Sequence, residues 1–199
     1  MASILLDLSI DRYTRVQASI MTTRNRQLHH QDVILVNEQD QETGRAEKLY
    51  AHENNLLHRA FSVFIFNQEA EPQLLLQQRA LDKYHSPGLW TNTCCSHPRP
   101  NEDIIEAGER RLQEELGIKS TLKNLGWFHY NAHFANGLAE NEIDHVLIGT
   151  LAKGALIQPN RQEVHAIRWV SVTTLEQELA ATPRCFTPWL ALALSKITK

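Results

Sequence analysis

Hydrophobic residues in this chain occur mainly in short runs, separated by polar segments rich in Asn, Asp, Gly and Pro. Runs of five to nine residues with such boundaries are typical of buried strands. Within residues 164–170, Val164, Ala166, Arg168 and Val170 alternate with His165, Ile167 and Trp169. This period of two is that of a strand, whose successive side chains point to opposite faces. We expect strands at residues 32–36, 60–66, 73–79, 125–130, 143–151 and 164–170.

The polar segments predict the connections between these strands. Six turn-prone residues, 67–72, join the second strand to the third, which favours a β-hairpin. Residues 37–40 predict a turn after the first strand, and Gly44 supports that turn. Residues 48–58 match neither the strand nor the helix pattern, so no element is predicted there.

The hydrophobic period changes after residue 100. Apolar residues recur at every third or fourth position from Ile104 to Leu116, so one face of a helix would be apolar. We predict a helix over residues 101–116, and Gly117 is suited to end it because glycine adopts the left-handed conformation of a helix C-cap.

Two further helices are predicted near the C-terminus. Thr173 or Thr174 can cap a helix over residues 175–181, and Pro188 suits the first turn of a helix over residues 189–197. The predicted strands outnumber the helices and do not alternate with them. We therefore expect an α/β protein of the α+β kind, with a mixed β-sheet sandwiched between α-helices, rather than a doubly wound sheet.

Length and charge limit the classes of function. At 199 residues, 42% of them hydrophobic, the chain can bury one sizeable core. A net charge of −3 gives no basic field, so we expect no binding to nucleic acid or to a membrane. No run approaches the roughly 18 apolar residues of a membrane helix. We expect residues 1–30 to be an extension, flexible or a short docking helix, and residues 31–199 to form the domain.

Cysteine and histidine usage adds a compartment and a type of chemistry. The three cysteines are odd in number and two of them are adjacent, which argues against a disulfide framework and for a reducing cytoplasm. Ten histidines in a domain of this size indicate a metal site or a proton-transfer site.

The segment from Gly88 to Gly117 has the highest density of reactive groups. Cys95 lies two positions before His97, and a thiol beside an imidazole can act as an acid, a base or a nucleophile. A free cysteine is more often an inert buried hydrophobe, and Cys94 is the candidate for that role. From these residues alone, both interpretations stay open.

A second candidate site involves Glu140 and Glu142 at the start of a predicted strand. Side chains two positions apart share a face of a strand, and two adjacent carboxylates are stabilised by a shared cation. His52, His58 and His97 could complete a site for Mn, Mg, Fe or Zn. Taken singly, the glutamate pair is more often a solvated strand end, and each histidine a hydrogen-bonding residue.

Four basic residues would form a basic rim around such a site if the fold brought them together: Lys48, Arg79, Lys83 and Arg111. Scattered cations are usually surface charges, so this expectation depends on the fold.

Residues 102–118 resemble the Nudix box, in which a glutamate is followed eight positions later by Arg-Glu, an apolar residue, Glu-Glu and glycine. The matching residues include Glu102, Arg110 and Glu115. Ser96 stands where the box has a glycine, and Arg111 where it has the glutamate of Arg-Glu.

Four more segments extend the resemblance: Trp-Thr-Asn-Thr-Cys-Cys-Ser-His-Pro at 90–98, Trp-Phe-His-Tyr at 127–130, Glu-Asn-Glu at 140–142 and Phe-Thr-Pro-Trp at 186–189. Together with the box they are similar to the type 1 isopentenyl-diphosphate Δ-isomerases, Nudix-fold enzymes that interconvert isopentenyl and dimethylallyl diphosphate. The similarity covers residues 31–195 and implies a Nudix-like isomerase domain.

The resemblance also implies residue roles. It implies Cys95 as the catalytic thiol and Glu140 as the catalytic carboxylate, with Tyr130 as its partner. The implied metal ligands are His52, His58, His97, Glu140 and Glu142, and Glu115 for a second, diphosphate-bound Mg²⁺. The implied substrate contacts are Lys48, Arg79, Lys83 and Arg111 for the diphosphate and Trp189 for the isoprenoid tail. The segment between His52 and His58 is one residue shorter than in the family pattern.

The implied partners are therefore a small-molecule isoprenoid diphosphate, Mg²⁺ and a second divalent metal (Mn²⁺, Mg²⁺ or Zn²⁺), with no organic cofactor, in a cytoplasmic monomer or homodimer. Moving a double bond requires adding one proton and removing another, so the site needs an acid and a base. The reaction passes through a carbocation-like species, which needs an electron-rich pocket that excludes water. The alternatives are a Nudix diphosphohydrolase, which Arg111 disfavours, and a catalytically silent binding domain.

Overall fold

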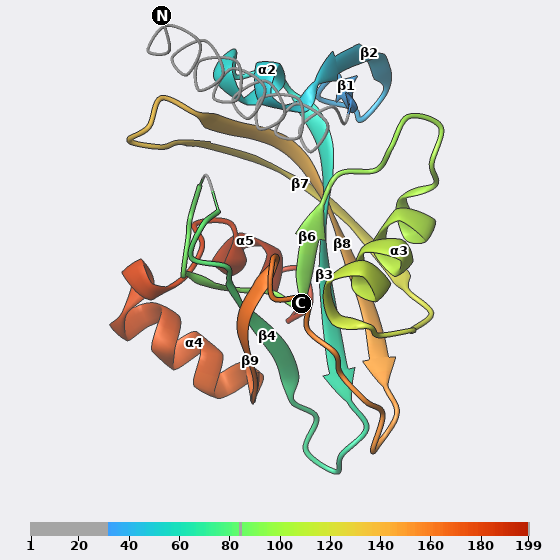
Figure 1. Ribbon diagram of the computed structural model, residues 1–199, viewed down its shortest axis with the longest axis vertical. Helices are drawn as coiled ribbons and strands as arrows, with labels where there is room; N and C mark the ends of the chain where they lie inside the picture. Colours follow the sequence, from blue (N-terminus) through green and yellow to red (C-terminus); the bar gives the residue numbers. More distant parts are fainter. Residues whose placement is uncertain (1–31, 84, 199) are drawn as a thin grey trace, which may run out of the picture.

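The structure is a computed structural model that describes residues 32–83 and 85–198, so the expected extension at 1–30 lies outside the described residues. Its framework is a nine-stranded mixed sheet. Strand β3 (His58–Asn67) lies at the centre of this sheet, because its apolar run from Phe61 to Phe66 is covered on both faces (Figure 1).

Four strands pair directly with β3. β8 (Ala139–Leu151) runs parallel to it, whereas β1 (Asp32–Val36), β4 (Leu74–Arg79) and β6 (Cys94–Ser96) are antiparallel to it. The remaining strands extend the sheet from these neighbours: β2 (Glu42–Glu47) from β1, β5 (Trp90–Thr91) and β9 (Val164–Val170) from β4, and β7 (Lys123–His133) from β8.

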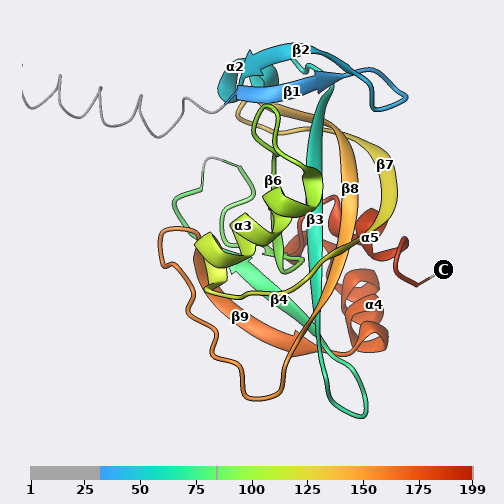
Figure 2. The same cartoon turned by 90° about the vertical axis from the view of Figure 1, so that its right-hand side faces the viewer.

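Helices cover both faces of the sheet. Phe61, Val63 and Ile65 of β3 pack in one core with helix α3 (Ile104–Leu116). Phe64, whose side chain points to the opposite face, packs in a second core with α4 (Val172–Ala181) and α5 (Leu190–Leu194). Figure 2 shows α3 and α4 on opposite sides of β3 and β8. The predicted mixed sheet between helices is confirmed, as are the hairpin pairing and the six predicted strands.

Helix α3 is held close to the sheet. Its N-cap Asp103 accepts a hydrogen bond from the Ile105 backbone N–H at 2.8 Å, so the helix begins at residue 104 rather than 101. Gly117 ends it at φ 67°, as predicted. A Cβ at Gly108 would lie 2.6 Å from Leu147 Cδ1, so any larger residue would require Leu147 to shift.

The short elements differ most from the sequence predictions. Residues 48–58, left open, begin with α2 (Lys48–Glu53), whose first turn is capped by the Glu47 carboxylate. The assignment of Gly44 to a turn was wrong, because it pairs with Leu35 inside β2. The loop after Gly88 contains the strands β5 and β6.

The C-terminal helices also depart from the predicted bounds. Ser171, rather than Thr173 or Thr174, caps α4, accepting a hydrogen bond from the Thr174 N–H at 3.1 Å. Helix α5 spans residues 190–194 instead of 189–197, after a single 3₁₀ turn at Pro183–Cys185. Among the described residues, no helix is long and apolar enough to cross a bilayer.

Candidate active site

One pocket brings together most of the predicted site residues. It lies where β3, β4, β6 and β8 meet α3 and the segment before β9. The predicted residues that line it are Lys48, Arg79, Lys83, Cys95, His97, Arg111, Glu115, Glu140, Glu142 and Trp189. The basic rim is thus a feature of the fold and not a set of scattered surface charges.

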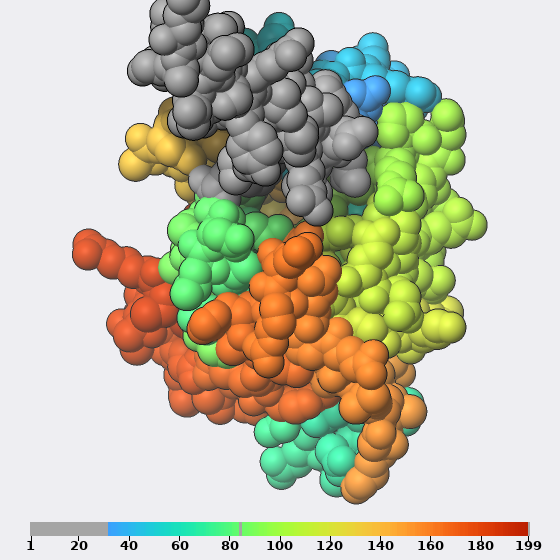
Figure 3. Space-filling view, viewed as in Figure 1, coloured from blue at the N-terminus to red at the C-terminus, as the bar shows by residue number. Residues whose placement is uncertain are grey.

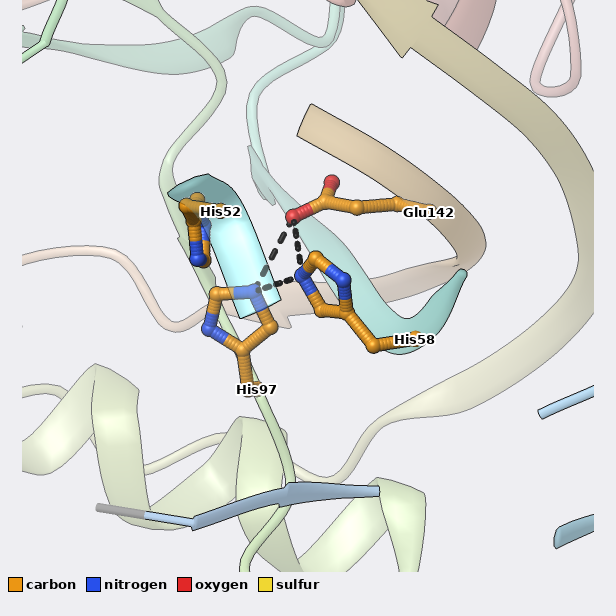
Figure 4. Close-up of side chains that lie close together, drawn as sticks. All are labelled: His52, His58, His97 and Glu142. Atoms are coloured by element: carbon orange, nitrogen blue, oxygen red, sulfur yellow. Dashed lines mark hydrogen bonds and ion pairs between the residues drawn. The ribbon is translucent and has the colours of Figure 1, made fainter. Parts of the chain in front are cut away.

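Strand register assembles a cluster of possible metal ligands beside this pocket. His58 of β3 is paired with Glu142 of β8, and β6, next to β3, leads directly into His97. Helix α2 supplies His52, despite the shortened segment between it and His58. We call these four residues the ligand cluster: His52, His58, His97 and Glu142. One ligand atom from each of them lies within 4.8 Å of the ligand atoms of the other three (Figure 4).

Hydrogen bonds fix which nitrogen of two of the rings faces the cluster. His58 Nδ1 lies 2.8 Å from the Leu56 carbonyl and His52 Nδ1 lies 2.6 Å from the Lys48 carbonyl. A carbonyl can only accept, so each Nδ1 donates and each neutral ring keeps its lone pair on Nε2. His58 Nε2 nevertheless lies 3.1 Å from His97 Nε2 and 3.4 Å from Glu142 Oε1.

Converging lone pairs of this kind repel one another unless a proton or a cation lies between them. Nearly complete burial makes the repulsion costly, since His52 and His58 are 1% and 0% exposed. Three imidazoles and one carboxylate are a ligand set suited to a divalent transition metal or Mg²⁺. The residues present therefore fit a divalent cation.

The protonation states agree with this fit. Burial, aided by His58, lowers the pKa of His52 to about 4, and burial with Lys48 lowers the pKa of His97 well below its ordinary value. Burial opposes ionisation of Glu142, but its contacts with the His58 and His97 rings hold its pKa well below the usual range. At neutral pH these groups are thus in the forms that bind metal.

Cys95 and Cys94 point to opposite faces of β6. Cys94 is fully buried in the core beneath α3, which fits the inert role expected for it. Cys95 lines the pocket, with Arg79 Nη1 3.8 Å from its Sγ. Burial raises the pKa of the Cys95 thiol to about 12, and Arg79 only partly offsets this effect. Cys95 is therefore a protonated thiol at neutral pH, which suits an acid rather than a thiolate nucleophile.

Glu140 lies in the same pocket but outside the ligand cluster, as does Glu115. Glu140 is 4% exposed, and its Oε1 lies 3.3 Å from His85 Nε2. Its Oε2 has no hydrogen-bond partner among the described residues, so one carboxylate oxygen is available in the pocket. Burial and the nearby Glu142 charge raise the pKa of Glu140 well above its ordinary value.

Trp189 supplies the aromatic wall of the pocket. Its indole N–H donates to Asn92 Oδ1 at 3.1 Å, which fixes the ring. Tyr130 does not line the pocket directly; its ring packs edge-on against Trp189 with centroids 6.1 Å apart. Trp90, another aromatic of the predicted motif, lies beneath the Arg168 guanidinium at 4.7 Å and does not line the pocket.

Protein carboxylates already contact part of the basic rim. Arg111 Nη2 lies 2.5 Å from Glu115 Oε1, and Glu115 Oε2 accepts a hydrogen bond from Gln77 at 3.1 Å. Lys83 donates to Glu163 Oε2, which also lies 3.6 Å from Arg111 Nη2.

Three ionisable pocket residues were missed from the sequence: His85, Asp144 and Glu163. Strand periodicity could have indicated Asp144, which follows Glu142 by two positions on the same face of β8. No local pattern indicates His85 or Glu163, because each reaches the pocket from outside the strands.

Comparisons with known proteins agree with this geometry. Residues 56–190 match the NUDIX domain family model. An isopentenyl-diphosphate Delta-isomerase of Aliivibrio fischeri strain MJ11 is 47% identical over 83% of this chain and 93% of its own length. One from Burkholderia multivorans is 46% identical over 79% of this chain and 87% of its own.

Solved structures show the same fold. DR0079 from Deinococcus radiodurans superposes with a TM-score of 0.66 at 20% identity, covering 84% of this chain and 99% of that one. A MutT protein from Methanosarcina mazei superposes with a TM-score of 0.56 at 19% identity, covering 71% and 93%. Sequence identities this low establish the fold alone. The family model and the sequence relatives also establish the family: the chain belongs to the isopentenyl-diphosphate Δ-isomerase family of the NUDIX fold.

Proposed function

We propose that this chain interconverts isopentenyl diphosphate and dimethylallyl diphosphate. The observation that carries the proposal is that one pocket holds a protonated thiol, Cys95, a buried carboxylate, Glu140, and the basic rim. The curated relatives are named for this reaction, which supports the same activity here.

The ligand cluster of His52, His58, His97 and Glu142 would hold one divalent cation. We propose Glu140, which lines the pocket outside the cluster, as a further ligand. We propose Mn²⁺, Mg²⁺ or Zn²⁺ for this cluster, and Mg²⁺ for Glu115 together with the diphosphate. A divalent cation in the cluster supplies positive charge that offsets the buried carboxylates and tunes the proton affinity of neighbouring groups.

Cys95 and Glu140 are proposed to move the protons. Double-bond transposition adds a proton at one carbon and removes one from another. The Cys95 thiol, protonated at neutral pH, holds a proton for the alkene. Burial raises the pKa of Glu140, and a cation in the ligand cluster would offset this effect, so that Glu140 would be ionised and could accept the proton that leaves. In the reverse direction the two groups exchange roles.

Trp189 is proposed to stabilise the carbocation-like species between the two proton transfers. An aromatic face attracts a nearby cation by roughly 0.5–2 kcal/mol, more where water is excluded. Trp189 is 3% exposed and fixed by Asn92, so its ring is held in a dry part of the pocket. Tyr130 is proposed as the partner of Glu140, and its ring also packs against Trp189.

The basic rim is proposed to bind the diphosphate. Phosphate oxygens favour guanidinium and ammonium donors, and four of these line the pocket. Anchoring the diphosphate would leave the isoprenoid tail at Cys95, Glu140 and Trp189. We propose that the enzyme acts in the cytoplasm, where its three free cysteines would stay reduced, as a monomer or homodimer.

The test is an isomerisation assay with isopentenyl diphosphate and Mg²⁺ on wild type, Cys95→Ala and Glu140→Val. Each variant is expected to lose at least about 100-fold in kcat, because each lacks a proton-transferring group. Cys185→Ala, which removes an exposed thiol, is the control and should retain full activity. Near-normal turnover by either pocket variant would contradict the mechanism, and phosphate release by wild type would favour a diphosphohydrolase instead.

A further inference from the structure

Glu163 has no role in the proposed reaction, yet it contacts two members of the basic rim. Its Oε2 accepts a hydrogen bond from Lys83 and lies 3.6 Å from Arg111 Nη2. The contact joins two segments that are distant in sequence: the one after β4 and the one before β9, which lie side by side on the face seen in Figure 3. A single carboxylate oxygen thus contacts the donor groups of both cations, through a hydrogen bond at Lys83 and at ion-pair distance from Arg111, whose nitrogens also pair with Glu114 and Glu115.

Those donors are the ones proposed to bind the diphosphate. A carboxylate and a phosphate present the same kind of acceptor to an ammonium or a guanidinium group. Burial alone would raise the pKa of Glu163, but the charges of Lys83 and Arg111 more than offset this effect and hold the pKa below its ordinary value. The carboxylate is therefore ionised at neutral pH. Glu163 and an incoming phosphate group therefore compete for the same positive charge.

Among the described residues, four cations line the pocket together with five carboxyl groups: Glu115, Glu140, Glu142, Asp144 and Glu163. Burial raises the pKa of Glu140 and of Asp144, whereas the pKa of Glu163 is lowered, so Glu163 is one of the groups that place negative charge in the pocket. Removing one negative charge from such a pocket should strengthen the binding of any anion.

Glu163 can leave its position more easily than its neighbour Glu115. Its side chain is 25% exposed, whereas that of Glu115 is 4% exposed. The Glu163 backbone is fixed independently of the side chain, since its carbonyl accepts from Ala80 N and its N–H donates to the Asn160 carbonyl. The carboxylate can thus rotate into water without moving the chain.

We propose that Glu163 is an internal anion that the substrate diphosphate displaces, and that it makes the pocket selective for diphosphates over singly charged or compact anions. The proposal rests on the proposed function, in which Lys83 and Arg111 bind the diphosphate. A diphosphate can reach the rest of the basic rim while it displaces Glu163. Inorganic phosphate reaches fewer of these donors, so it competes poorly with an attached carboxylate.

The experiment measures the Kd of inorganic pyrophosphate and of inorganic phosphate by calorimetry, with Mg²⁺ present, for wild type, Glu163→Gln and Glu163→Asp. Glu69→Gln is the matched control, because Glu69 also pairs with a lysine, Lys153, at 3.2 Å but lies outside the pocket. Glu163→Gln should bind phosphate about 10-fold more tightly and pyrophosphate with a smaller gain, so the selectivity falls. Glu163→Asp, which keeps the charge, should stay closer to wild type, and the control should match wild type.

The proposal is overturned if Glu163→Gln binds phosphate no more tightly than wild type, or if Glu163→Asp gains as much as Glu163→Gln. Isomerisation by wild type is measured on the same preparations. A wild type that does not isomerise rejects the proposed function, whereas an active wild type with unchanged phosphate affinity in Glu163→Gln rejects only the role of Glu163.

Discussion

His58 and Glu142 occupy paired positions of β3 and β8, whereas Lys83 and Glu163 lie on segments outside any strand. The side chains of His58 and Glu142 are 0% and 9% exposed, but those of Lys83 and Glu163 are 24% and 25% exposed. The ligand cluster is therefore set by the sheet, and this part of the basic rim by ion pairs at the pocket mouth.

This difference separates two tasks of one pocket. The sheet fixes the positions of the buried ligand atoms, so their lone pairs cannot move apart. A bound cation is the simplest way to offset the repulsion between them. Ion pairs that remain partly in water contribute little to stability and can exchange partners. We expect substitutions in the ligand cluster to abolish function and those in the basic rim to weaken substrate binding.

The largest effect is expected from Glu142→Gln. This change keeps the shape of the side chain but removes the only carboxylate of the ligand cluster. Metal affinity should fall by at least about 100-fold and isomerisation by about 1000-fold. Bound metal after dialysis and turnover are the two measurements, and Glu176→Gln, an exposed change on α4, is the control. Retention of both metal and activity would show that the ligand cluster is not a metal site.

Long apolar strands of the sheet could be predicted from the sequence, whereas short elements held by pairing with distant residues could not. Apolar runs such as the one in β3 are buried because of their own composition, and they were predicted. β6 has three residues and α2 has six, and tertiary pairing holds them more than local preference does. The sequence therefore did not indicate these two elements, although they position Cys95 and His52.

Prediction of the site met a similar limit. The residues of the ligand cluster were named as a possible metal site from their types and spacing, and the resemblance to a known family implied the same ligands. Strand register explains why His58, His97 and Glu142 meet. His85 was missed because its neighbours in sequence give no periodic signal, and its contact with Glu140 exists only in the folded chain. Long-range register and loop placement are the parts that a single sequence leaves undetermined.

A smaller effect is expected from Lys83→Met, which tests the basic rim. The change removes one donor to the diphosphate while keeping an apolar stem of similar length. KM should rise by about 10- to 100-fold with kcat changed by only a few fold, because the interaction is made with both ground state and transition state. Steady-state kinetics give the two constants separately. Lys153→Met, at a lysine that pairs with Glu69 outside the pocket, should leave both constants unchanged.

If Lys83→Met reduced kcat as strongly as Glu142→Gln, the distinction between a rigid cluster and an exchangeable rim would be lost. A KM equal to that of wild type would remove Lys83 from the diphosphate site.

The smallest effect is expected from an ion pair that belongs to neither region. Arg110, next to Arg111 on α3, binds the Glu102 carboxylate through two nitrogens, Nε at 2.5 Å and Nη2 at 2.8 Å. The hydrogen bond from Arg110, partly opposed by burial, lowers the pKa of Glu102 from its ordinary value of 4.5. A lowered carboxyl pKa stabilises the fold at pH values above 4.5, and this contribution is lost as the pH falls through the folded-state pKa.

Glu102→Gln should therefore lower the free energy of unfolding by about 1 kcal/mol at pH 7 and by progressively less below about pH 4.5, with isomerisation retained. Urea unfolding of both proteins across this pH range measures the difference. A cost that stays constant with pH would mean that Glu102 acts through packing or neutral hydrogen bonding. A loss of isomerisation would instead connect this pair of the Nudix box to the pocket.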